Sequence, residues 1–398
     1  MAETLSLKEA AERVGVSVDT LRRWARDGLI PEVDGTGEWT TAAVAHARIV
    51  ARLRDRGHSL EQIREAGDQG KLAFSYIEDM FEADRAPSVS IDEAADRTGL
   101  EPALIERFWT SLGLPANSLD ELSEEDVEAL QYVAAILDSG FPLVAFLQLC
   151  RVYGQALSQI ADAEVRLFHL YVHEPLIRDG VPGLEMAEQM EDLARALLPL
   201  SSPVMDYVHQ RFLQHFVEQD VVGHMESELE DEDVDLGRIR VAIAFADLAG
   251  YTRFTEEEGE EEALSSVERF VEGVTNTLPD DARVVKTIGD EVMVVGQDIG
   301  ALVDWAVGFT LLFDERPEPR IGVHYGTTLY RDGDYFGRDV NLTSRVVARA
   351  RGGEVLVSDA VTDALRDAPH LTFEEIGQVK LKGFAEPRML CRAVRKEE

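Results

Sequence analysis

Apolar residues recur three and four positions apart through most of the first 225 residues, a spacing that predicts amphipathic helices. The clearest of these segments are 127–152, 156–172 and 186–222. After residue 238 the pattern changes, because short apolar runs typical of strands alternate with segments of helical spacing. The runs are 239–245, 283–287, 292–295 and 354–357, and the most regular helical segment is 260–277. The pattern therefore predicts an all-α first half followed by an α/β domain.

An acidic run, ESELEDEDVD at 226–235, separates the two patterns. Such a run cannot bury itself in a core, so it predicts a boundary, either a plain solvated linker or a switch whose charges repel one another at neutral pH. The chain has 398 residues, enough for two or three domains. We expect a first domain at 1–70, a helical domain at 71–225, the acidic linker or switch at 226–237 and an α/β domain at 238–398.

The helical half contains an internal repeat. Segment 6–31, SLKEAAERVGVSVDTLRRWARDGLIP, aligns without a gap with segment 90–115, SIDEAADRTGLEPALIERFWTSLGLP. After a one-residue slip the match continues from 53–57 to 136–140. The sequence thus predicts two copies of one helical module, the second at 88–145, each with a helix, a glycine turn and a second helix.

The first copy resembles the DNA-binding head of MerR-like regulators, a winged helix-turn-helix, over roughly the first 65 residues, including Trp24, the segment 29–31 and the helical segment 48–56. The resemblance implies that the second helix enters the major groove, where Arg22, Arg23 and Arg26 would face phosphates. The expected wing, 32–40, carries three acidic residues and no basic one, although wings of this kind usually contact phosphates. Two interpretations remain open: DNA binding, or a helix-turn-helix reused for packing or dimerisation. The second copy lacks the arginine cluster and is expected to be structural.

Charge and composition limit the function further. The net charge of -37 argues against broad binding of nucleic acid or anionic membranes, although a local basic patch is compatible with it. Cys150 and Cys391 lie far apart, without metal-ligand spacing, and are expected to be reduced thiols in a cytoplasm. No apolar run approaches the length of a membrane helix, and no targeting segment is recognisable, so we expect a cytoplasmic protein without a membrane partner.

Two other features of the helical half have more than one interpretation. His169 and His173 lie four apart and could share a helix face that holds a metal, but no third ligand is apparent. Partly buried helical histidines are the alternative, and a pH-sensing role is a third. The apolar stripes at 141–152 and 197–216 are expected to form core or a dimer interface, and a lipid pocket is also compatible with them.

Four strings in the last third place charged or amide side chains beside apolar runs. They are FADLAGYT at 245–252, VKTIGDEVM at 285–293, DYFGRDVNLTSR at 334–345 and VKLKGF at 379–384. Asp247 ends an apolar strand, and Asp290 lies at an expected hairpin tip that could sit beside it. Two such carboxylates could clamp two divalent cations, as phosphoryl chemistry requires. Taken singly, each aspartate also fits a helix cap or a turn.

The loop that follows Asp247 leads into a helix, so its backbone N–H groups could contact phosphates. Its residues are Leu248, Ala249, Gly250, Tyr251 and Thr252.

In this order and spacing, the four strings resemble the catalytic domain of the class III nucleotidyl cyclases, over roughly residues 238–394. The resemblance implies a ferredoxin-like α/β fold, and it puts the family's two metal aspartates, which bind two Mg²⁺ or Mn²⁺ ions, on Asp247 and Asp290. The family's purine-selecting lysine and aspartate fall on Lys286 and Asp334, a pair that favours ATP over GTP.

The same resemblance assigns the remaining site residues. The family's Asn–Arg pair falls on Asn341 and Arg345, which would orient the ribose and neutralise charge at the α-phosphate. Its triphosphate-binding lysine falls on Lys382, with Lys380 as an alternative. The metal aspartates of this family come from one subunit and the other groups from its partner, which implies a head-to-tail homodimer with the active sites at the subunit interface.

The resemblance therefore implies an adenylate cyclase that converts ATP to 3′,5′-cyclic AMP and pyrophosphate. The helical half beyond the first module resembles the N-terminal regulatory domains of actinobacterial, pH-responsive adenylate cyclases, which implies control by pH or by a small ligand. A different class remains open: a transcription regulator in which a cyclase-like domain senses nucleotide and dimerises a DNA-binding head.

Overall fold

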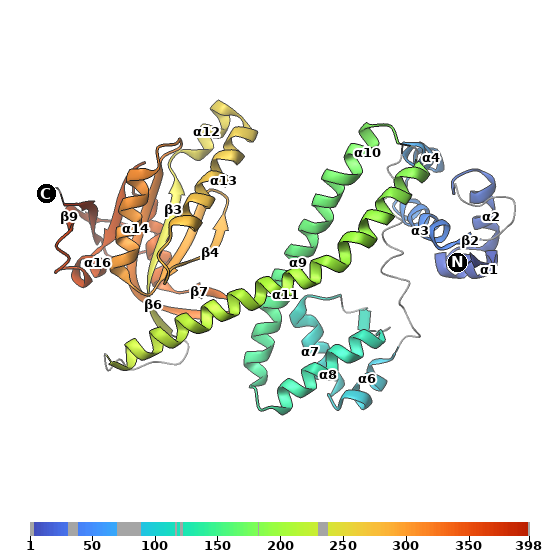
Figure 1. Cartoon of the computed structure of the whole chain (residues 1–398), viewed down its shortest axis with the longest axis horizontal. Helices are drawn as coiled ribbons and strands as arrows, with labels where there is room; N and C mark the ends of the chain where they lie inside the picture. The colour runs from blue at the N-terminus through green and yellow to red at the C-terminus, as the bar shows by residue number, and fades with distance from the viewer. Residues whose placement is uncertain are drawn as a thin grey trace. The chain divides into compact units, whose positions relative to one another are not determined.

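The computed structural model describes residues 4–30, 39–69, 89–115, 118–119, 122–181, 183–229 and 238–396. The chain forms two compact units, residues 1–213 and residues 214–398. The first is built from helices and the second around a mixed sheet (Figure 1). Among the described residues, no helix is both long enough and apolar enough to cross a membrane.

The first helical module begins with a short β-ladder, in which Leu5 pairs with Trp39. Helix α1 starts in a capping box, because the Ser6 hydroxyl accepts from the backbone N–H of Glu9 while the Glu9 carboxylate accepts from the N–H of Ser6. It ends at Gly15, whose φ of 77° is the left-handed conformation that glycine adopts without strain. The elements are β1 (Thr4–Leu5), α1 (Leu7–Val14), α2 (Val18–Arg26), β2 (Trp39–Thr40), α3 (Thr41–Asp55) and α4 (Leu60–Asp68). Their apolar faces share one core.

The second module repeats this arrangement. Helix α6 is capped by Ser90 and ends at Gly99, with φ 75°, as α1 does at the equivalent positions. An isolated bridge between Val89 and Leu122 stands where the first copy has its two-stranded ladder. The elements are α6 (Ile91–Thr98), α7 (Pro102–Leu112) and α8 (Glu124–Asp138), and they enclose a separate core. The multidomain fold with two helix-turn-helix modules is therefore as the sequence predicts.

Two long helices, α9 (Leu143–Phe168) and α11 (Gly183–Leu229), complete the helical half. Between them lie the π-helical turn η2 (His169–His173) and the short helix α10 (Glu174–Arg178). The periodic segment 127–152 is not one helix but parts of α8 and α9, because Gly140 takes a φ of 91° and Pro142 precedes α9. Helix α11 continues through Leu229, so the first residues of the expected acidic linker are helical, while 230–237 lie outside the described residues.

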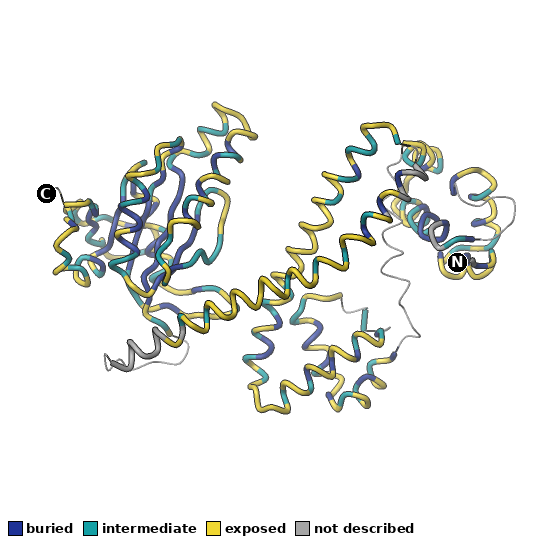
Figure 2. The backbone as a smooth tube through the Cα atoms, in the orientation of Figure 1, coloured by how far each residue is buried: buried dark blue, intermediate teal, exposed yellow. Residues whose placement is uncertain are grey.

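The two apolar stripes of this half differ in burial. In the first, Phe146, Leu147 and Cys150 are buried. In the second, Leu200 and Val204 are about 60% exposed, and Figure 2 shows most of α9 and α11 as exposed. The first stripe is therefore partly core, whereas most residues of the second are exposed.

The second unit is an eight-stranded sheet in the order β4-β5-β3-β6-β8-β10-β9, with β7 paired to β6. Among the strand pairs of the described residues, only β6–β8 is parallel. The strands are β3 (Arg238–Leu248), β4 (Arg283–Ile288), β5 (Glu291–Gly296), β6 (Pro319–Arg331), β7 (Asp334–Phe336), β8 (Val355–Ser358), β9 (Leu371–Val379) and β10 (Arg388–Arg395). The helices are α12 (Tyr251–Glu258), α13 (Glu260–Thr277), α14 (Ile299–Leu312), α15 (Arg338–Val347) and α16 (Asp359–Ala364).

Both faces of the central strand β3 are buried, which explains its unbroken apolar run (Figure 2). One face, which includes Ala244 and Ala246, packs against α13 and α14 in the main core. The other, which includes Ile243 and Phe245, packs with Tyr335 and with Val347 of α15. Since side chains alternate along a strand, Asp247 lies on the α15 face. The polar residues of the candidate site are thereby presented on one side of the sheet.

Candidate active site

Asp247 lies at the end of β3, between residues of two neighbouring strands. The antiparallel register pairs it with Glu291 of β5 on one side and with Arg320 of β6 on the other. It is only 8% exposed. The Arg320 guanidinium donates through Nε to Asp247 Oδ2 at 2.8 Å, and its Nη2 donates to the same oxygen. The guanidinium therefore compensates a carboxylate that has little access to water.

Asp290 occupies the turn between β4 and β5, as the sequence predicts. Gly289 before it has a φ of 65°, a conformation typical of glycine in tight hairpin turns. Burial, followed by a hydrogen bond to Asp247 and the negative charge of that residue, raises the pKa of Asp290 to about 6. The turn therefore brings the two aspartates into contact.

Glu291 is a third carboxylate of this cluster. Burial raises the pKa of Glu291, and the charges of Asp247 and Asp290 raise it further, while Arg320 and Arg345 oppose the rise. Glu291 and Arg320 are not recognisable as site residues from the sequence, because only the strand register brings them beside Asp247. The weak signal in the sequence was the position of Glu291 directly after Asp290.

The carboxylate cluster fits divalent cations. The described part of the chain contains no group of three or more His, Cys, Asp or Glu side chains arranged as a complete metal site. Mg²⁺ in nucleotide enzymes is held by one or two carboxylates together with substrate phosphates, so a pair of aspartates suffices. Burial and, after it, the nearby Asp247 raise the pKa of Asp290, and a cation between the two carboxylates would favour their charged forms.

The loop after β3 presents backbone groups beside this cluster. Gly250, with φ 77°, precedes α12, whose first turn has no side-chain cap. The backbone N–H of Ala249 already has a partner, because it donates to the carbonyl of Glu318 at 2.9 Å. The N–H groups of Tyr251 and Thr252 belong to the first turn of α12, where an anion is favoured.

Lys286 and Asp334 meet within one chain. A β-bulge between Val284 and Lys286 shifts the register, so that Lys286 pairs with Met293, on the α15 face. There its ammonium donates to Asp334 Oδ2. The other oxygen of Asp334 accepts from the backbone N–H of Tyr335 at 2.8 Å. The side chains remain 35% and 26% exposed, so a ligand can reach both.

Asn341 and Arg345 lie one turn apart on α15 and are both exposed. The opposite side of that helix, which includes Leu342 and Val346, is buried. The spacing of four thus places an amide and a guanidinium together on the free surface of the helix.

Lys382 and Lys380 both lie in the loop after β9, and both are exposed. Leu381 between them is 2% exposed and anchors the loop. The backbone carbonyl of Lys380 accepts from Arg349 Nη2 at 2.8 Å. Both ammonium groups are therefore accessible to a ligand.

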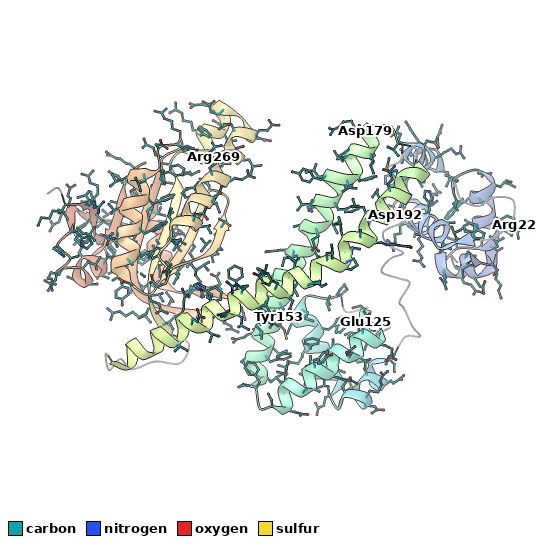
Figure 3. The ribbon with its side chains drawn as sticks, in the orientation of Figure 1. Arg22, Glu125, Tyr153, Asp179, Asp192 and Arg269 are labelled. Atoms are coloured by element: carbon teal, nitrogen blue, oxygen red, sulfur yellow. The ribbon has the colours of Figure 1, made fainter. Side chains whose placement is uncertain are left out.

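The candidate DNA-contacting arginines occupy the outer side of α2, since Leu21 and Trp24 are buried while Arg22, Arg23 and Arg26 are exposed. Arg22, labelled in Figure 3, pairs with Asp19 of the same helix at 2.9 Å, and Arg26 pairs with Asp27 at 3.4 Å. Two of the three charges are therefore partly compensated. Most of the expected wing lies outside the described residues.

His169 and His173 are brought together by the π-helical turn, with their Nδ1 atoms 3.0 Å apart. His173 is 1% exposed. They contact each other, and the described residues add no third metal ligand. Cys150 and Cys391 are both buried free thiols.

Three families match different parts of the chain. Residues 238–394 match the adenylate and guanylate cyclase catalytic domain, residues 32–217 the adenylate cyclase regulatory domain, and residues 6–37 the MerR family of regulatory proteins.

Related proteins are similar over most of their length. An adenylate cyclase of Streptomyces coelicolor is 32% identical over 286 residues, which cover 70% of this chain and 72% of that protein. A pH-sensitive adenylate cyclase of Mycobacterium tuberculosis is 29% identical over 349 residues, or 86% of this chain and 84% of that protein. Among solved structures, an adenylyl cyclase from P. aeruginosa is 22% identical, with a TM-score of 0.36. The aligned region covers 42% of this chain and 98% of that protein.

Proposed function

The chain belongs to the adenylate cyclase family, and on that premise we propose that it converts ATP to 3′,5′-cyclic AMP and pyrophosphate in a homodimer whose sites use two divalent cations. The helical half, which matches the regulatory domain of this family, would control the reaction. The observation that carries the proposal is the Lys286–Asp334 pair, because a donor and an acceptor held side by side match the N1 and 6-amino edge of adenine.

Asp247 and Asp290 would hold the cations. When bound, two Mg²⁺ or Mn²⁺ ions would neutralise the triphosphate and stabilise both the attacking and the leaving oxygen. Arg320 donates to the Asp247 carboxylate and would hold it in place. The first turn of α12 would receive phosphate oxygens through the backbone N–H groups of Tyr251 and Thr252.

Lys286 would donate to adenine N1, and Asp334 would accept from the 6-amino group. Guanine presents the opposite pattern at these positions, a donor at N1 and an acceptor at O6, so it would leave both side chains without a partner. The ion pair that the two residues make with each other supports this role, since a site that is already assembled needs little rearrangement when the base binds.

Asn341 and Arg345 would act on the ribose and the α-phosphate of a nucleotide held by the aspartates of a second chain. Lys382, or Lys380 in its place, would contact the terminal phosphates. The exposure of Asn341 and Arg345 on the free surface of α15 supports their availability to a partner subunit. The family resemblance supports the same division of the site between two chains.

Complementation tests the shared site. The full chain is assayed for cyclic AMP formation from ATP with MnCl₂, as wild type, as Asp247→Ala, as Arg345→Ala and as an equimolar mixture of the two variants. Each variant alone should be inactive. In the mixture, half of the dimers are mixed and each has one intact site of two, so about one quarter of wild-type activity should return. A mixture as inactive as its components contradicts sites shared between subunits, and a wild type that makes no cyclic AMP contradicts the enzymatic proposal.

Regulation by pH is supported by the similarity to a pH-sensitive cyclase and tested by a pH profile. Turnover of the wild-type chain is measured across the range in which histidines titrate, from about pH 5.5 to 8. The same measurement on the segment 238–398, provided that its circular dichroism shows a folded sheet, reveals whether the helical half changes the profile. Identical profiles contradict the regulatory proposal.

DNA binding by the first module stays a second candidate, favoured by the three arginines on the outer side of α2. A gel shift that is lost on substitution of Arg22 and Arg23 by alanine, with cyclase activity retained, would support a combined role. Equal DNA retention by wild type and variant contradicts it.

A further inference from the structure

Strand β4 carries a second cation, Arg283, three residues before Lys286. Its Nη2 donates to the hydroxyl of Tyr335 at 2.8 Å, and its guanidinium carbon lies 5.7 Å from the centroid of the Tyr335 ring. The same carbon lies 5.0 Å from the centroid of the Phe216 ring. Phe216 belongs to the part of α11 that forms one compact unit with the sheet. One guanidinium thus contacts an aromatic residue of strand β7 and one of the helix.

Tyr335 connects this guanidinium to the adenine-selecting pair. It directly follows Asp334, is 6% exposed, and its backbone N–H donates to Asp334 Oδ1 at 2.8 Å. The ring of Tyr330 packs against it edge-on, with centroids 5.2 Å apart. A hydrogen bond from Arg283 to the buried phenol therefore restrains the residue that orients the Asp334 carboxylate.

The strand register puts Arg283 and Lys286 on the same face of β4. Arg283 pairs with Val295 and Lys286 with Met293, and both partners belong to the cluster on the α15 face. In a regular strand, residues three apart point to opposite faces, so the bulge at Val285 is what aligns them. Arg283 thereby links β4, which carries the lysine of the pair, to β7, which carries the aspartate.

Helix α11 makes a second contact, with the turn that precedes β4. The side-chain amide of Gln219 donates to the backbone carbonyl of Asp280. Phe216 and Gln219 are half-buried and one turn apart, whereas Val217 between them is 54% exposed. One face of this helix segment therefore covers residues 280–283, and its other side is free.

We propose that Arg283 is a positioning residue for purine selection and that Phe216 of the connecting helix holds it in place. Through this contact the helix in which the match to the regulatory domain ends acts on the base-recognition pair, rather than only on the approach of two subunits. The inference rests on the proposed adenylate cyclase function. It adds a physical route by which the helical half changes the affinity for ATP.

The strength of the contact sets the expected effect. A partly desolvated cation–π contact, together with a hydrogen bond from a charged donor, is strong enough to change an equilibrium by about 5- to 30-fold. Loss of Phe216 exposes one side of Arg283 to water and lets the guanidinium leave Tyr335. The carboxylate of Asp334 then becomes less ordered, which weakens recognition of adenine and not the chemical step.

The test compares variants of the full chain by equilibrium binding of non-reactive ATP and GTP analogues and by steady-state kinetics. Phe216→Ala and Arg283→Gln should each raise the KM for ATP about 5- to 30-fold and lower the ATP-to-GTP preference, with kcat changed less than twofold. Arg283→Lys should recover part of the loss, because it keeps the charge. Val217→Ala removes similar apolar bulk from the exposed side of the helix and should match the wild type.

A double-mutant cycle separates coupling from a merely structural role. Because Phe216 acts through Arg283, the chain with both Phe216→Ala and Arg283→Gln should be no worse than Arg283→Gln alone. Additive losses, or a Phe216→Ala chain indistinguishable from Val217→Ala, overturn the inference. A wild type that binds both analogues equally would instead overturn the proposed adenine selection, so the two failures are distinguishable. Tyr335→Phe, which keeps the ring and removes the acceptor, should reproduce part of the Arg283→Gln effect even if the latter folds poorly.

Discussion

Replacement of Asp334 by asparagine tests base selection at one atom. The substitution keeps size and shape but removes the charge that, in the proposed site, would accept from the 6-amino group of adenine. The Asp334 side chain is only 26% exposed and Lys286 donates to it directly. A hydrogen bond to a charged group contributes about 1.5–3 kcal/mol, so kcat/KM for ATP should fall about 10- to 150-fold.

The same substitution should hardly change folding. The Lys286–Asp334 pair is partly exposed, and ion pairs of this kind contribute at most about 1 kcal/mol to stability because solvent screens them. The asparagine amide can also donate to guanine O6, which the carboxylate repels. The kcat/KM for GTP should therefore be retained or should rise. The ATP-to-GTP ratio of kcat/KM should fall by at least the factor by which kcat/KM for ATP falls.

The assay measures cyclic nucleotide formation from ATP and from GTP in parallel, with the unfolding midpoint of each chain as a control for folding. Asp332→Asn, a carboxylate two residues earlier on the β6–β7 turn, serves as the matched control and should leave both rates unchanged. An unchanged ATP-to-GTP ratio in Asp334→Asn, with the fold intact, would refute the assignment of this pair to the base.

Three further predictions concern other parts of the molecule. Arg320→Gln leaves the 8%-exposed Asp247 without its cationic partner, so the unfolding free energy measured in EDTA should fall by about 3 kcal/mol. Part of this loss should be recovered in MnCl₂. An equal loss in Arg320→Lys would contradict the role of the charge. Gly154→Ala would place a methyl group against a backbone carbonyl of α7 and should lower the unfolding free energy by about 1–3 kcal/mol. Gly308→Ala in α14 has open space around the added methyl group and should be neutral or stabilising. Equal melting temperatures of the two variants would refute the packing argument. A hydrogen bond from the buried His324 lowers the pKa of Asp339. The Asp339 carboxyl is therefore protonated less in the folded chain than in the unfolded chain. Its stabilising contribution is present above the ordinary pKa of about 4 and is lost as the pH falls through the lowered value, so urea titrations of wild type and Asp339→Asn should converge in acid, and a constant difference would contradict this.

Much of the candidate site was predictable because short strings carry it. Asp247 at a strand end and Asp290 after a glycine are local patterns, and the structure has the expected strand and hairpin at both. The resemblance of four such strings to one family then assigned Lys286 and Asp334, although they lie 48 residues apart. Their direct contact could not be read from alternation, because the bulge after Val284 reverses the face on which Lys286 lies.

Residues that reach the site only because of strand register could not be predicted from the sequence. Arg320 and Glu291 flank Asp247 only because β6 and β5 pair with β3 on either side. Arg283 contacts Phe216, 67 residues away in the sequence, across elements whose packing no local pattern encodes. In each case the chemistry depends on a pairing between distant segments.

The sequence by itself determined the local geometry of this protein. Capping serines, glycines at positive φ and apolar periodicity fixed where helices and strands begin and end, since these preferences act between residues a few positions apart. Only the tertiary structure decided which polar groups meet, because strand order and register bring together side chains that the chain separates by tens of residues. That is why the two aspartates were identifiable from the sequence, whereas the arginines that hold Asp247 and Tyr335 in place became visible only in the folded sheet.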